Sequence, residues 1–406
     1  MTEWREVGNP FKGVSKMEIT KIECIPVTLK LHKQVIMSGG PLTGSTCVLV
    51  KIHTDEGITG IAESGGTSEW YGGDTQESVM AMINNYYAPQ ALLGEDPFNI
   101  EKIVARMDKI ARHNNQSKAV IDFALHDIMG KKLGLPVYKL IGGKSIDKIP
   151  LGVVMNSGTH KEMAEEAMNI FKAGFRSAKI KVGYGTQEEQ VEMVRAVREA
   201  VGSEARIQID ANGGWNYFQA LEILKKMEKY DVAIAEQPVP WWDVDGLARL
   251  RRKVNIPIFA DESATELKHL MEIIQKDAAD GLFLKVEKAG GILKARRWAS
   301  IARAANLPVM CGCMVGSGIQ AAAQIHYLTA DEWMSYLEQE ALGPLHIHGV
   351  LDTVKNPIKD DLAKNVPRYE NGYVYPPEGP GLGVELNEEL IPKLLSPGLK
   401  PTVIGK

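Results

Sequence analysis

Three acidic residues recur at the ends of successive apolar segments in the middle of the chain. Asp210 ends RIQID, Glu236 ends VAIAE and Asp261 follows PIFA. Neighbouring acids are about 25 residues apart, the length of a strand plus a returning helix. Carboxylates on three adjacent strands would form a hard oxygen cluster suited to Mg²⁺ or Mn²⁺. Salt bridges to nearby lysines are the alternative, although acids that converge without a cation would repel one another.

Lysines stand at related positions on two further segments. Lys179 and Lys181 are two residues apart, so both side chains point to the same face of a strand. Two adjacent ammonium groups lower each other's pKa, which makes a lysine a usable base. Lys285 lies four strands further on, across a closed barrel from Lys181. A lysine on each side of a metal-bound carboxylate favours α-proton abstraction, with the metal stabilising the enediolate.

The segments that carry these residues belong to a repeating pattern after residue 150. Eight β-rich runs alternate with amphipathic helical stretches, and they begin at Ile149, Ser177, Arg206, Val232, Pro257, Gly281, Pro308 and Trp333. Eight such units predict a (β/α)₈ barrel of the α/β class, in which the carboxyl ends of the strands meet at one mouth. A doubly wound open sheet is the alternative, but no G-x-G-x-x-G motif follows the first run.

A different pattern precedes the barrel. Residues 17–63 alternate apolar and polar side chains, as antiparallel strands do, with a hairpin turn at residues 55–57. Residues 75–141 have the periodicity of helices, and Gly134 and Pro136 end the last of these. This part of the chain therefore predicts a separate α+β domain.

We expect three parts in total. An N-terminal α+β capping domain would cover residues 1–145, the catalytic barrel residues 146–360, and a C-terminal tail residues 361–406 that packs back on the capping domain. Within the first part, residues 35–45 are uncharged and rich in glycine. They are interpreted as either a long surface loop or a lid over the site. Substrate specificity would come from this segment, the loop after residue 70 and the end of the eighth strand.

Composition and charge exclude several classes of protein. The 406 residues include 47 Lys plus Arg and 51 Asp plus Glu, a net charge of −4, which disfavours nucleic acids and anionic membranes as partners. Four cysteines are too few for a disulfide framework. The N-terminus has no apolar signal region, and the uncharged stretch 304–330 is interrupted by Pro and Gly. We therefore expect a cytoplasmic protein with no membrane or nucleic-acid partner.

Five motifs in this order resemble those of the enolase superfamily, and more narrowly its muconate lactonizing enzyme (muconate cycloisomerase) subgroup. They are KIKVG (179–183), DAN (210–212), EQP (236–238), ADES (260–263) and KVEKAGG (285–291). The helical stretch from Ser117 and the tail motif GPGLGVEL are similar to segments of the family's capping domain. The resemblance implies a modified TIM barrel, isomerase activity on a small carboxylate substrate, and a symmetric homo-oligomer.

The resemblance also implies a role for each matching residue. The ligands of one Mg²⁺ or Mn²⁺ per subunit would be Asp210, Glu236 and Asp261. The acid/base pair would be Lys181 and Lys285, with Lys179 contacting the substrate carboxylate and lowering the pKa of Lys181. Further residues that would contact the substrate or support the ligands are Asn212, Glu262, Glu340, Met37 and Met314. Lys288 is expected to begin the next loop.

The eighth run bears on which reaction this is. Dipeptide epimerases of the subgroup have D-x-D before a proline, whereas this chain has Glu340 and Leu342 before Pro344. The missing second acid favours a cycloisomerase or a racemase of a blocked amino acid, such as an N-acyl amino acid. A dehydratase of a hydroxy acid or hydroxyproline-like substrate is the alternative on the same scaffold, and a non-catalytic binding protein is a more remote one.

Three other features have more than one interpretation. His32 and Lys33 could attract a second substrate carboxylate or be exposed strand residues. Trp241 and its neighbour could cover the substrate or pack against the next helix. His346 and His348 form the H-x-H of metal hydrolases, but that motif belongs on the first barrel strand and here follows the eighth, so we expect no separate zinc site.

Overall fold

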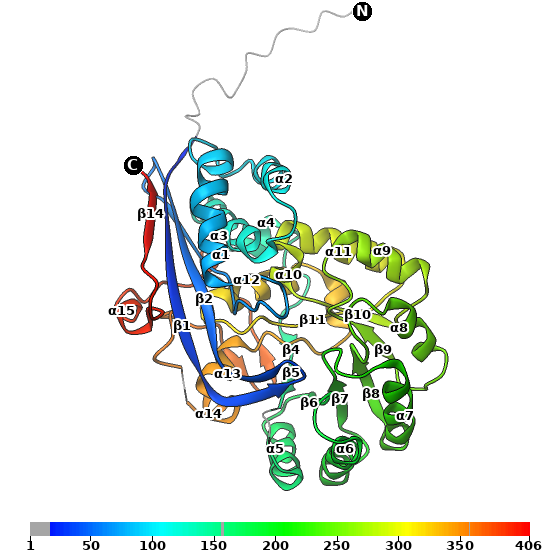
Figure 1. Ribbon diagram of the computed structural model, residues 1–406. Helices are drawn as coiled ribbons and strands as arrows, with labels where there is room; N and C mark the ends of the chain where they lie inside the picture. Colours follow the sequence, from blue (N-terminus) through cyan, green and yellow to red (C-terminus); the bar gives the residue numbers. More distant parts are fainter. Residues whose placement is uncertain (1–16, 156–157, 357) are drawn as a thin grey trace, which may run out of the picture.

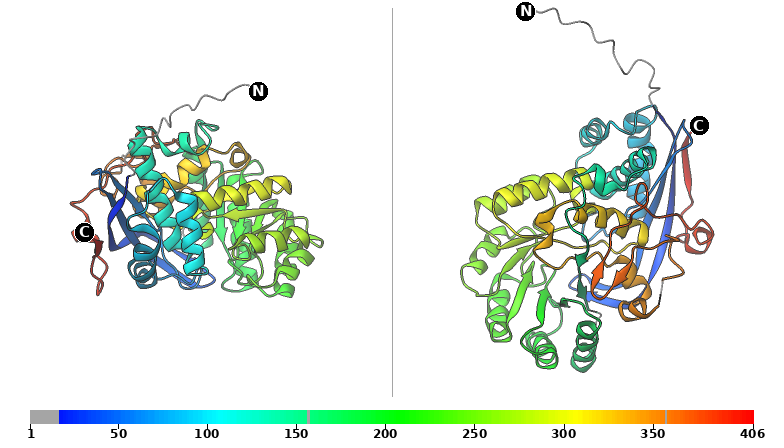
Figure 2. Two further views of the ribbon diagram at one scale, coloured as in Figure 1. Left: turned by 90° about the horizontal axis from the view of Figure 1, so that it is seen from above. Right: turned by 180° about the vertical axis from the view of Figure 1, so that it is seen from behind.

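The computed structural model describes residues 17–155, 158–356 and 358–406. A capping domain with an antiparallel sheet and helices lies on one side, and a curved parallel sheet ringed by helices lies on the other (Figures 1 and 2). No helix within these ranges is long and apolar enough to span a membrane. The uncharged stretch 304–330 is instead a helix end, a short strand, a loop and a helix, as the sequence indicated.

The capping sheet is antiparallel, in the order β14-β1-β2-β3. Its strands are β1 (Ile19–Met37), β2 (Gly40–Thr54), β3 (Thr59–Glu63) and β14 (Thr402–Gly405). The predicted turn at residues 55–57 joins β2 to β3, with Gly57 at a positive φ of 76°. The helices of this domain are α1 (Gln76–Met82), the π-helix η1 (Ile83–Leu92), α2 (Ile100–Ile110), α3 (Asn115–Leu133) and α4 (Val137–Leu140). Of these, α1, η1 and α3 pack against the sheet.

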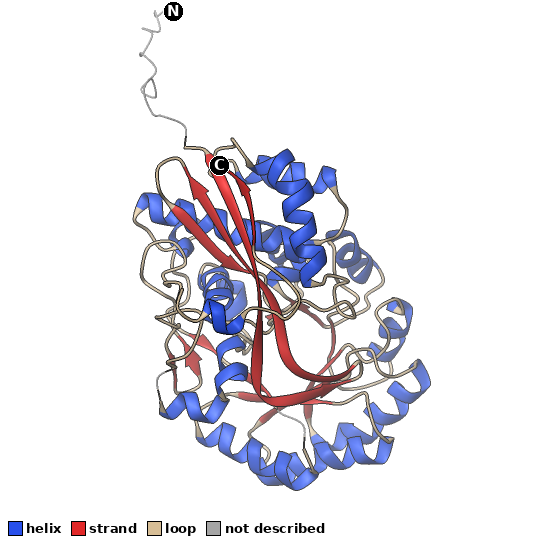
Figure 3. Cartoon of the chain, turned by 60° about the vertical axis from the view of Figure 1, so that its left-hand side comes forward, coloured by secondary structure: helices blue, strands red, loops and turns tan. Residues whose placement is uncertain are grey.

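The segment expected to be a loop or lid at residues 35–45 is the end of a β-hairpin. Met37 pairs with Gly40 and Val35 with Leu42, so only Ser38 and Gly39 form the turn. The apolar, β-branched residues before the turn extend the strand, and this outweighs the glycines. The register shifts between Lys30 and Val35, and such irregularities bend strands. Figure 3 shows the two long strands curving across the barrel.

The barrel sheet is parallel and its strands are neighbours in chain order. They are β5 (Gly152–Val154), β6 (Ser177–Lys181), β7 (Arg206–Asp210), β8 (Val232–Glu236), β9 (Ile258–Ala260), β10 (Gly281–Leu284) and β11 (Val309–Cys311). The helices that follow them are α5 (His160–Lys172), α6 (Gln187–Val201), α7 (Tyr217–Met227), α8 (Val244–Arg251), α9 (Leu267–Gln275), α11 (Ile292–Ala304) and α12 (Gly318–Thr329). The alternation predicts this barrel correctly.

The eighth run differs from the prediction at its start. Residues Glu332–Ser335 form a 3₁₀ helix, and extended backbone is found only near Gln339. There Gln339 N donates to Pro150 O at 2.8 Å, and Glu340 N donates to Cys311 O at 2.9 Å. This short segment therefore lies between β11 and β5 and closes the barrel. The turn-forming side chain of Asp331, which caps Trp333 N, explains why the run begins as a helix.

Local sequence signals define where several barrel helices begin. Helices α5, α6 and α7 each start at a capping box, whose N-cap residues are Thr159, Thr186 and Asn216. Inside the barrel, the apolar side chains of Ile234, Phe259, Phe283 and Met310 pack together from four consecutive strands. This layer fills the barrel beneath the strand ends, so the mouth has a solid base.

The C-terminal part returns to both domains. Strand β12 (Tyr369–Glu370) pairs with β13 (Tyr373–Val374), which pairs with β4 (Ile149–Pro150) just before the barrel. Helices α13 (Gly343–His348) and α14 (Val350–Lys355) precede the tail, and α15 (Ile391–Leu394) lies within it. Its last strand, β14, pairs with β1, so the chain end completes the capping sheet.

Candidate active site

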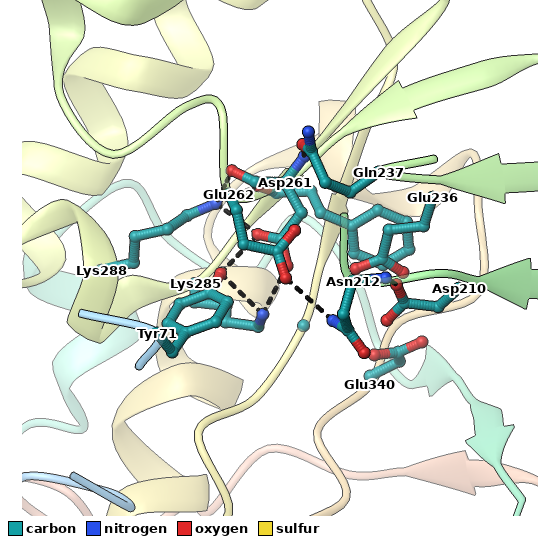
Figure 4. A network of polar contacts seen from close by, with 12 residues as sticks. Tyr71, Asp210, Asn212, Glu236, Gln237, Asp261, Glu262, Lys285, Lys288 and Glu340 are labelled. Atoms are coloured by element: carbon teal, nitrogen blue, oxygen red, sulfur yellow. Dashed lines mark hydrogen bonds and ion pairs between the residues drawn. The ribbon is translucent and has the colours of Figure 1, made fainter. Parts of the chain in front are cut away.

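The three predicted acids lie together at the barrel mouth (Figure 4). Asp210 and Glu236 are the last residues of β7 and β8 and are paired in register, and Asp261 directly follows β9. All three are at most 2% exposed. Burial raises the pKa of Glu236, and the neighbouring charges of Asp210 and Asp261 raise it further, since each carboxylate disfavours another.

Each acid is contacted by a lysine from another part of the barrel mouth. Lys181 Nζ lies 2.5 Å from Asp210 Oδ2, and Lys285 Nζ lies 2.6 Å from Asp261 Oδ2. Lys179 binds Glu236 and lies 2.5 Å from Glu340 Oε1. The structure therefore brings these predicted residues together and shows ion pairs among them.

The surroundings of Lys179 differ from the expectation that adjacent ammonium groups lower each other's pKa. Burial alone would lower the pKa of Lys179, but the carboxylates of Glu236 and Glu340 outweigh it and raise the pKa. Burial also opposes the charged form of Lys285, and Asp261 reverses that effect and raises its pKa. Carboxylates, rather than the neighbouring ammonium group, dominate the surroundings of these two lysines.

The donor set fits a hard divalent cation in its chemistry. Three buried carboxylates on adjacent strands are the oxygen ligands that Mg²⁺ takes in proteins. Nearby, Glu262 Oε2 is buried without a hydrogen-bond partner, and burial together with Asp261 raises the pKa of Glu262 to about 7. Across the described part of the chain, no three acidic, His or Cys side chains are gathered at metal-binding geometry, and lysines contact the oxygens of the three acids.

Asn212 connects the two predicted groups of residues. Its side chain accepts from Lys181 Nζ at 3.0 Å and donates to Glu262 Oε1 at 2.8 Å. Its backbone has a φ of 42°, in the left-handed region. Its carbonyl accepts a hydrogen bond of 2.7 Å from Ser38 Oγ, at the hairpin tip. The predicted residues Asn212 and Glu262 therefore lie between the barrel mouth and the capping domain.

Sequence reasoning missed two residues of the site. Tyr71, in the capping domain, donates to Asp261 and accepts from Lys285 Nζ at 2.7 Å, and the ammonium lies 3.9 Å from the ring centroid. Lys288 was expected to begin a loop, but it lies on the four-residue helix α10 (Val286–Ala289), is buried, and its Nζ lies 2.5 Å from Asp261 Oδ1. The only available signal for Tyr71 was an aromatic pair in the loop after residue 70.

A cavity of about 130 Å³ lies over these residues. Lysines and carboxylates of the barrel mouth line it, namely Lys179, Lys181, Lys285, Asp210 and Glu236. The predicted residues Met37, Met314 and Glu340 line it as well. His346 also lines it, and burial, helped by the charge of Lys181, lowers the pKa of that histidine to about 4. His348 instead lies 3.0 Å from Asp361, so the two histidines belong to different surroundings.

The remaining ambiguous residues lie outside this cavity. His32 and Lys33 line a separate surface cavity, where His32 Nε2 is 3.7 Å from Asp352 Oδ2. Trp241 and Trp242 are 62% and 67% exposed and line a wider outer cavity next to Tyr71. None of the four contributes to the wall of the inner cavity.

Comparison with known proteins decides the family. Residues 19–142 match the mandelate racemase / muconate lactonizing enzyme N-terminal domain, and residues 162–390 match the enolase C-terminal domain-like family. The chain belongs to this family. The predicted membership of the enolase superfamily and its muconate lactonizing enzyme subgroup is confirmed, as is the modified TIM barrel with an N-terminal cap.

Relatives with known activities are isomerases. The N-succinyl-L-Arg/Lys racemase of Bacillus cereus is 34% identical over 93% of this chain and 98% of its own length. Muconate cycloisomerase 1 of Rhodococcus opacus is 30% identical over 93% and 98%. The prediction of an isomerase-type enzyme of this superfamily is therefore confirmed.

Solved structures agree with this assignment. A mandelate racemase/muconate lactonizing family protein from Azoarcus sp. EbN1 is 51% identical, covers 95% of this chain and all of its own, and has a TM-score of 0.90. A dipeptide epimerase from Cytophaga hutchinsonii, solved with Mg and the dipeptide D-Ala-L-Val, is 29% identical over 96% of this chain and all of its own, with a TM-score of 0.85. Magnesium and small-molecule substrates thus occur among the relatives.

Proposed function

We propose that this protein is a divalent-metal-dependent isomerase that removes the proton α to a substrate carboxylate. The observation that carries the proposal is the placement of Lys181 and Lys285. They stand on β6 and directly after β10, four strands apart in the barrel sheet, with the three carboxylates on the strands between them. A substrate held over those carboxylates would have one lysine on each face of its α-carbon.

Each group of residues in the site has its own role in the proposed reaction. Asp210, Glu236 and Asp261 would hold Mg²⁺ or Mn²⁺, which when bound supplies positive charge beside the substrate carboxylate. Lys181 Nζ, as the neutral amine, accepts the α-proton on one face, and Lys285 Nζ donates a proton to the opposite face. Lys179, fixed between Glu236 and Glu340, orients the carboxylate end of the substrate.

The end of the eighth segment supports a choice among reactions. Leu342 is fully buried where a dipeptide epimerase would place its second acid, and Glu340 is already paired with Lys179. No carboxylate is therefore available there for the ammonium group of a dipeptide. This supports racemisation of a blocked amino acid or cycloisomerisation. A symmetric homo-oligomer with one metal ion per subunit remains part of the proposal.

The decisive experiment is proton NMR in D₂O with Mg²⁺ or Mn²⁺. The panel would contain N-acyl amino acids, muconates, proline derivatives, sugar acids and dipeptides. Wild-type protein should replace the α-proton of one class by deuterium, and Lys181→Ala and Lys285→Ala should each slow the isomerisation by about 10³-fold or more. The product spectrum separates isomerisation from loss of water, which would indicate the dehydratase.

The matched control is Lys161→Ala. Lys161 lies on α5 with a side chain that is 87% exposed, so its loss removes a lysine without touching the site. It should exchange the α-proton at the wild-type rate. Unchanged turnover in Lys181→Ala, with Lys161→Ala as the reference, would show that the base is assigned wrongly.

A further inference from the structure

The cavity above the carboxylates has two chemically different surfaces. Its charged floor consists of Lys179, Lys181, Asp210, Glu236, Lys285 and Glu340, all from the barrel. Its apolar roof consists of Leu31, Val35, Met37, Leu42 and Trp70, all from the capping domain. Among the described capping residues that line the cavity, none carries a charge. Charge is thus confined to the end of the cavity where a carboxylate and a metal would bind.

The roof also offers few free polar groups. Four hydroxyl side chains of the capping domain line the cavity. Ser45 Oγ donates to Val315 O, Thr67 Oγ1 donates to Thr46 O, and the Tyr71 hydroxyl donates to Asp261, while Ser68 Oγ accepts from Tyr71 N. The barrel wall beside the roof is formed by uncharged side chains such as Val154 and Met314. His346 is buried and stands beside Lys181, which favours its neutral form. A charged substrate group placed here would lose its hydration without gaining a partner, and that is costly.

The basic residues nearest in sequence to the roof do not supply it with a positive charge. His32 and Lys33 follow Leu31 directly, but they line a separate surface cavity, where His32 is paired with Asp352. The register of β1 shifts between Lys30 and Val35, so simple alternation does not hold there, and Lys33 lines the surface cavity together with His32 rather than the inner cavity. A second substrate carboxylate therefore finds no cation in the roof.

Contacts at its tip hold the hairpin of β1 and β2 in place over the barrel mouth. Ser38 Oγ binds the Asn212 carbonyl at 2.7 Å, and a Cβ on Gly39 would lie only 3.2 Å from the Trp70 ring. The roof is thus held at a fixed, small distance from the floor, which limits the size of what lies between them. The cavity between roof and floor has a volume of about 130 Å³ and is partly open to solvent, and a space of this size favours a compact group.

We infer that the substrate is a monocarboxylate whose part distal to the α-carbon is compact, uncharged and apolar. The inference rests on the proposed function for the placement of the carboxylate on the floor. It excludes substrates that carry a second carboxylate or a cation at the distal end, such as muconates, N-succinyl derivatives and derivatives of Arg or Lys.

Three isosteric ligands test the inference by calorimetry in the presence of Mg²⁺. They are 5-methylhexanoate, glutarate and 4-carbamimidoylbutanoate, which end in an isopropyl, a carboxylate and an amidinium group of the same shape. The first should bind at least about tenfold more tightly than the other two. Equal or tighter binding of glutarate or of the amidine would overturn the inference.

A variant pair shows whether the roof is responsible. Leu42→Lys adds a cation to the roof and should tighten glutarate binding by about tenfold, whereas Leu42→Gln, of similar size but uncharged, should not. Leu42 is partly exposed near the hairpin tip, so both variants should fold. Tightening of glutarate binding by both variants alike would show that the roof charge does not set the preference.

A second readout separates this inference from the proposed function. Wild-type protein should exchange the α-proton of N-acetyl-leucine in D₂O and leave that of its charged isostere N-acetylaspartate in place. Exchange with N-acetylaspartate would overturn the substrate class and leave the proposed chemistry intact. Retained binding selectivity among the three ligands, with no exchange in any compound, would refute the chemistry and leave the substrate class standing.

Discussion

The charged floor and the apolar roof of the cavity differ in origin, in polarity and in how they are held. The floor comes from the ends of parallel strands, and its side chains are fixed by ion pairs such as Lys181–Asp210 and Lys285–Asp261. The roof comes from one long hairpin and the loop after β3, and it is fixed by packing and by the Ser38 hydrogen bond. In the proposed function, the barrel carries the chemistry and the cap selects the substrate.

The largest expected effect is on the floor, in Glu236→Gln. The loss of one of three carboxylates should weaken Mg²⁺ binding by about 100-fold or more and lower turnover by about 10³-fold. Lys179 keeps Glu340 as its partner at 2.5 Å, so the fold should persist. Calorimetric titration with Mg²⁺ measures the affinity, and Glu222→Gln on the exposed face of α7 is the control. Unchanged affinity in Glu236→Gln would remove this residue from the metal site.

The difference between the floor and the roof also explains which parts of the site the sequence could predict. The acids and lysines of the floor follow the repeat of strand and helix, so their spacing revealed both the barrel and the residues at its mouth. The roof follows no repeat. Its hairpin was predicted as a loop because Gly39, Gly40 and Pro41 suggest a break, while the pairing of Val35 with Leu42 is decided by the partner strand.

Contacts that depend on tertiary folding escaped prediction for a related reason. Lys288 was assigned to a loop because nothing in the motif KVEKAGG shows that a four-residue helix turns its ammonium back to Asp261. Tyr71 lies 190 residues from Asp261 in sequence, and only the packing of the two domains brings them together. The pattern of apolar residues in the sequence also did not predict that the eighth run begins as a 3₁₀ helix.

A second prediction concerns acid stability and His346, which keeps the wall beside the roof neutral. Burial lowers its pKa in the folded protein to about 4 from the usual 6.5. As the pH falls from 6.5 to 4, the unfolded chain takes up a proton that the folded protein does not, so the free energy of unfolding decreases by about 3 kcal/mol. His346→Gln should lack this loss.

Urea unfolding of metal-free protein at pH 7 and pH 4 measures the difference. His326, whose pKa burial also lowers to about 4, is present in both proteins, so the comparison isolates His346. The same fall in stability in wild type and variant would mean that His346 is not held neutral.

Tyr71 belongs to the capping domain but contacts the floor, so replacing it tests whether the cap also contributes to the chemistry. Tyr71→Phe keeps the ring beside Lys285 and removes the hydroxyl that accepts from its ammonium. The hydroxyl also donates to Asp261, so the variant loses two hydrogen bonds to charged groups, and kcat should fall about tenfold. Exchange of the α-proton should slow more for the enantiomer whose α-proton faces Lys285, as NMR in D₂O would show.

The control for that experiment is Tyr86→Phe, which removes an exposed hydroxyl from η1. It should match wild type with both enantiomers. Equal slowing of both enantiomers in Tyr71→Phe would mean that Tyr71 supports the site as a whole rather than one lysine.

The smallest effect is expected at the contact between the two regions, in Ser38→Ala. The variant removes the hydrogen bond from the hairpin tip to the Asn212 carbonyl, and with it one constraint on the side chain that contacts both Lys181 and Glu262. A single neutral hydrogen bond is worth about 1 kcal/mol, so kcat/KM should fall by about fivefold while Tm changes little. Steady-state kinetics and thermal unfolding measure the two quantities. A large fall in Tm with unchanged kcat/KM would show that the hairpin contact stabilises the fold and does not position the floor.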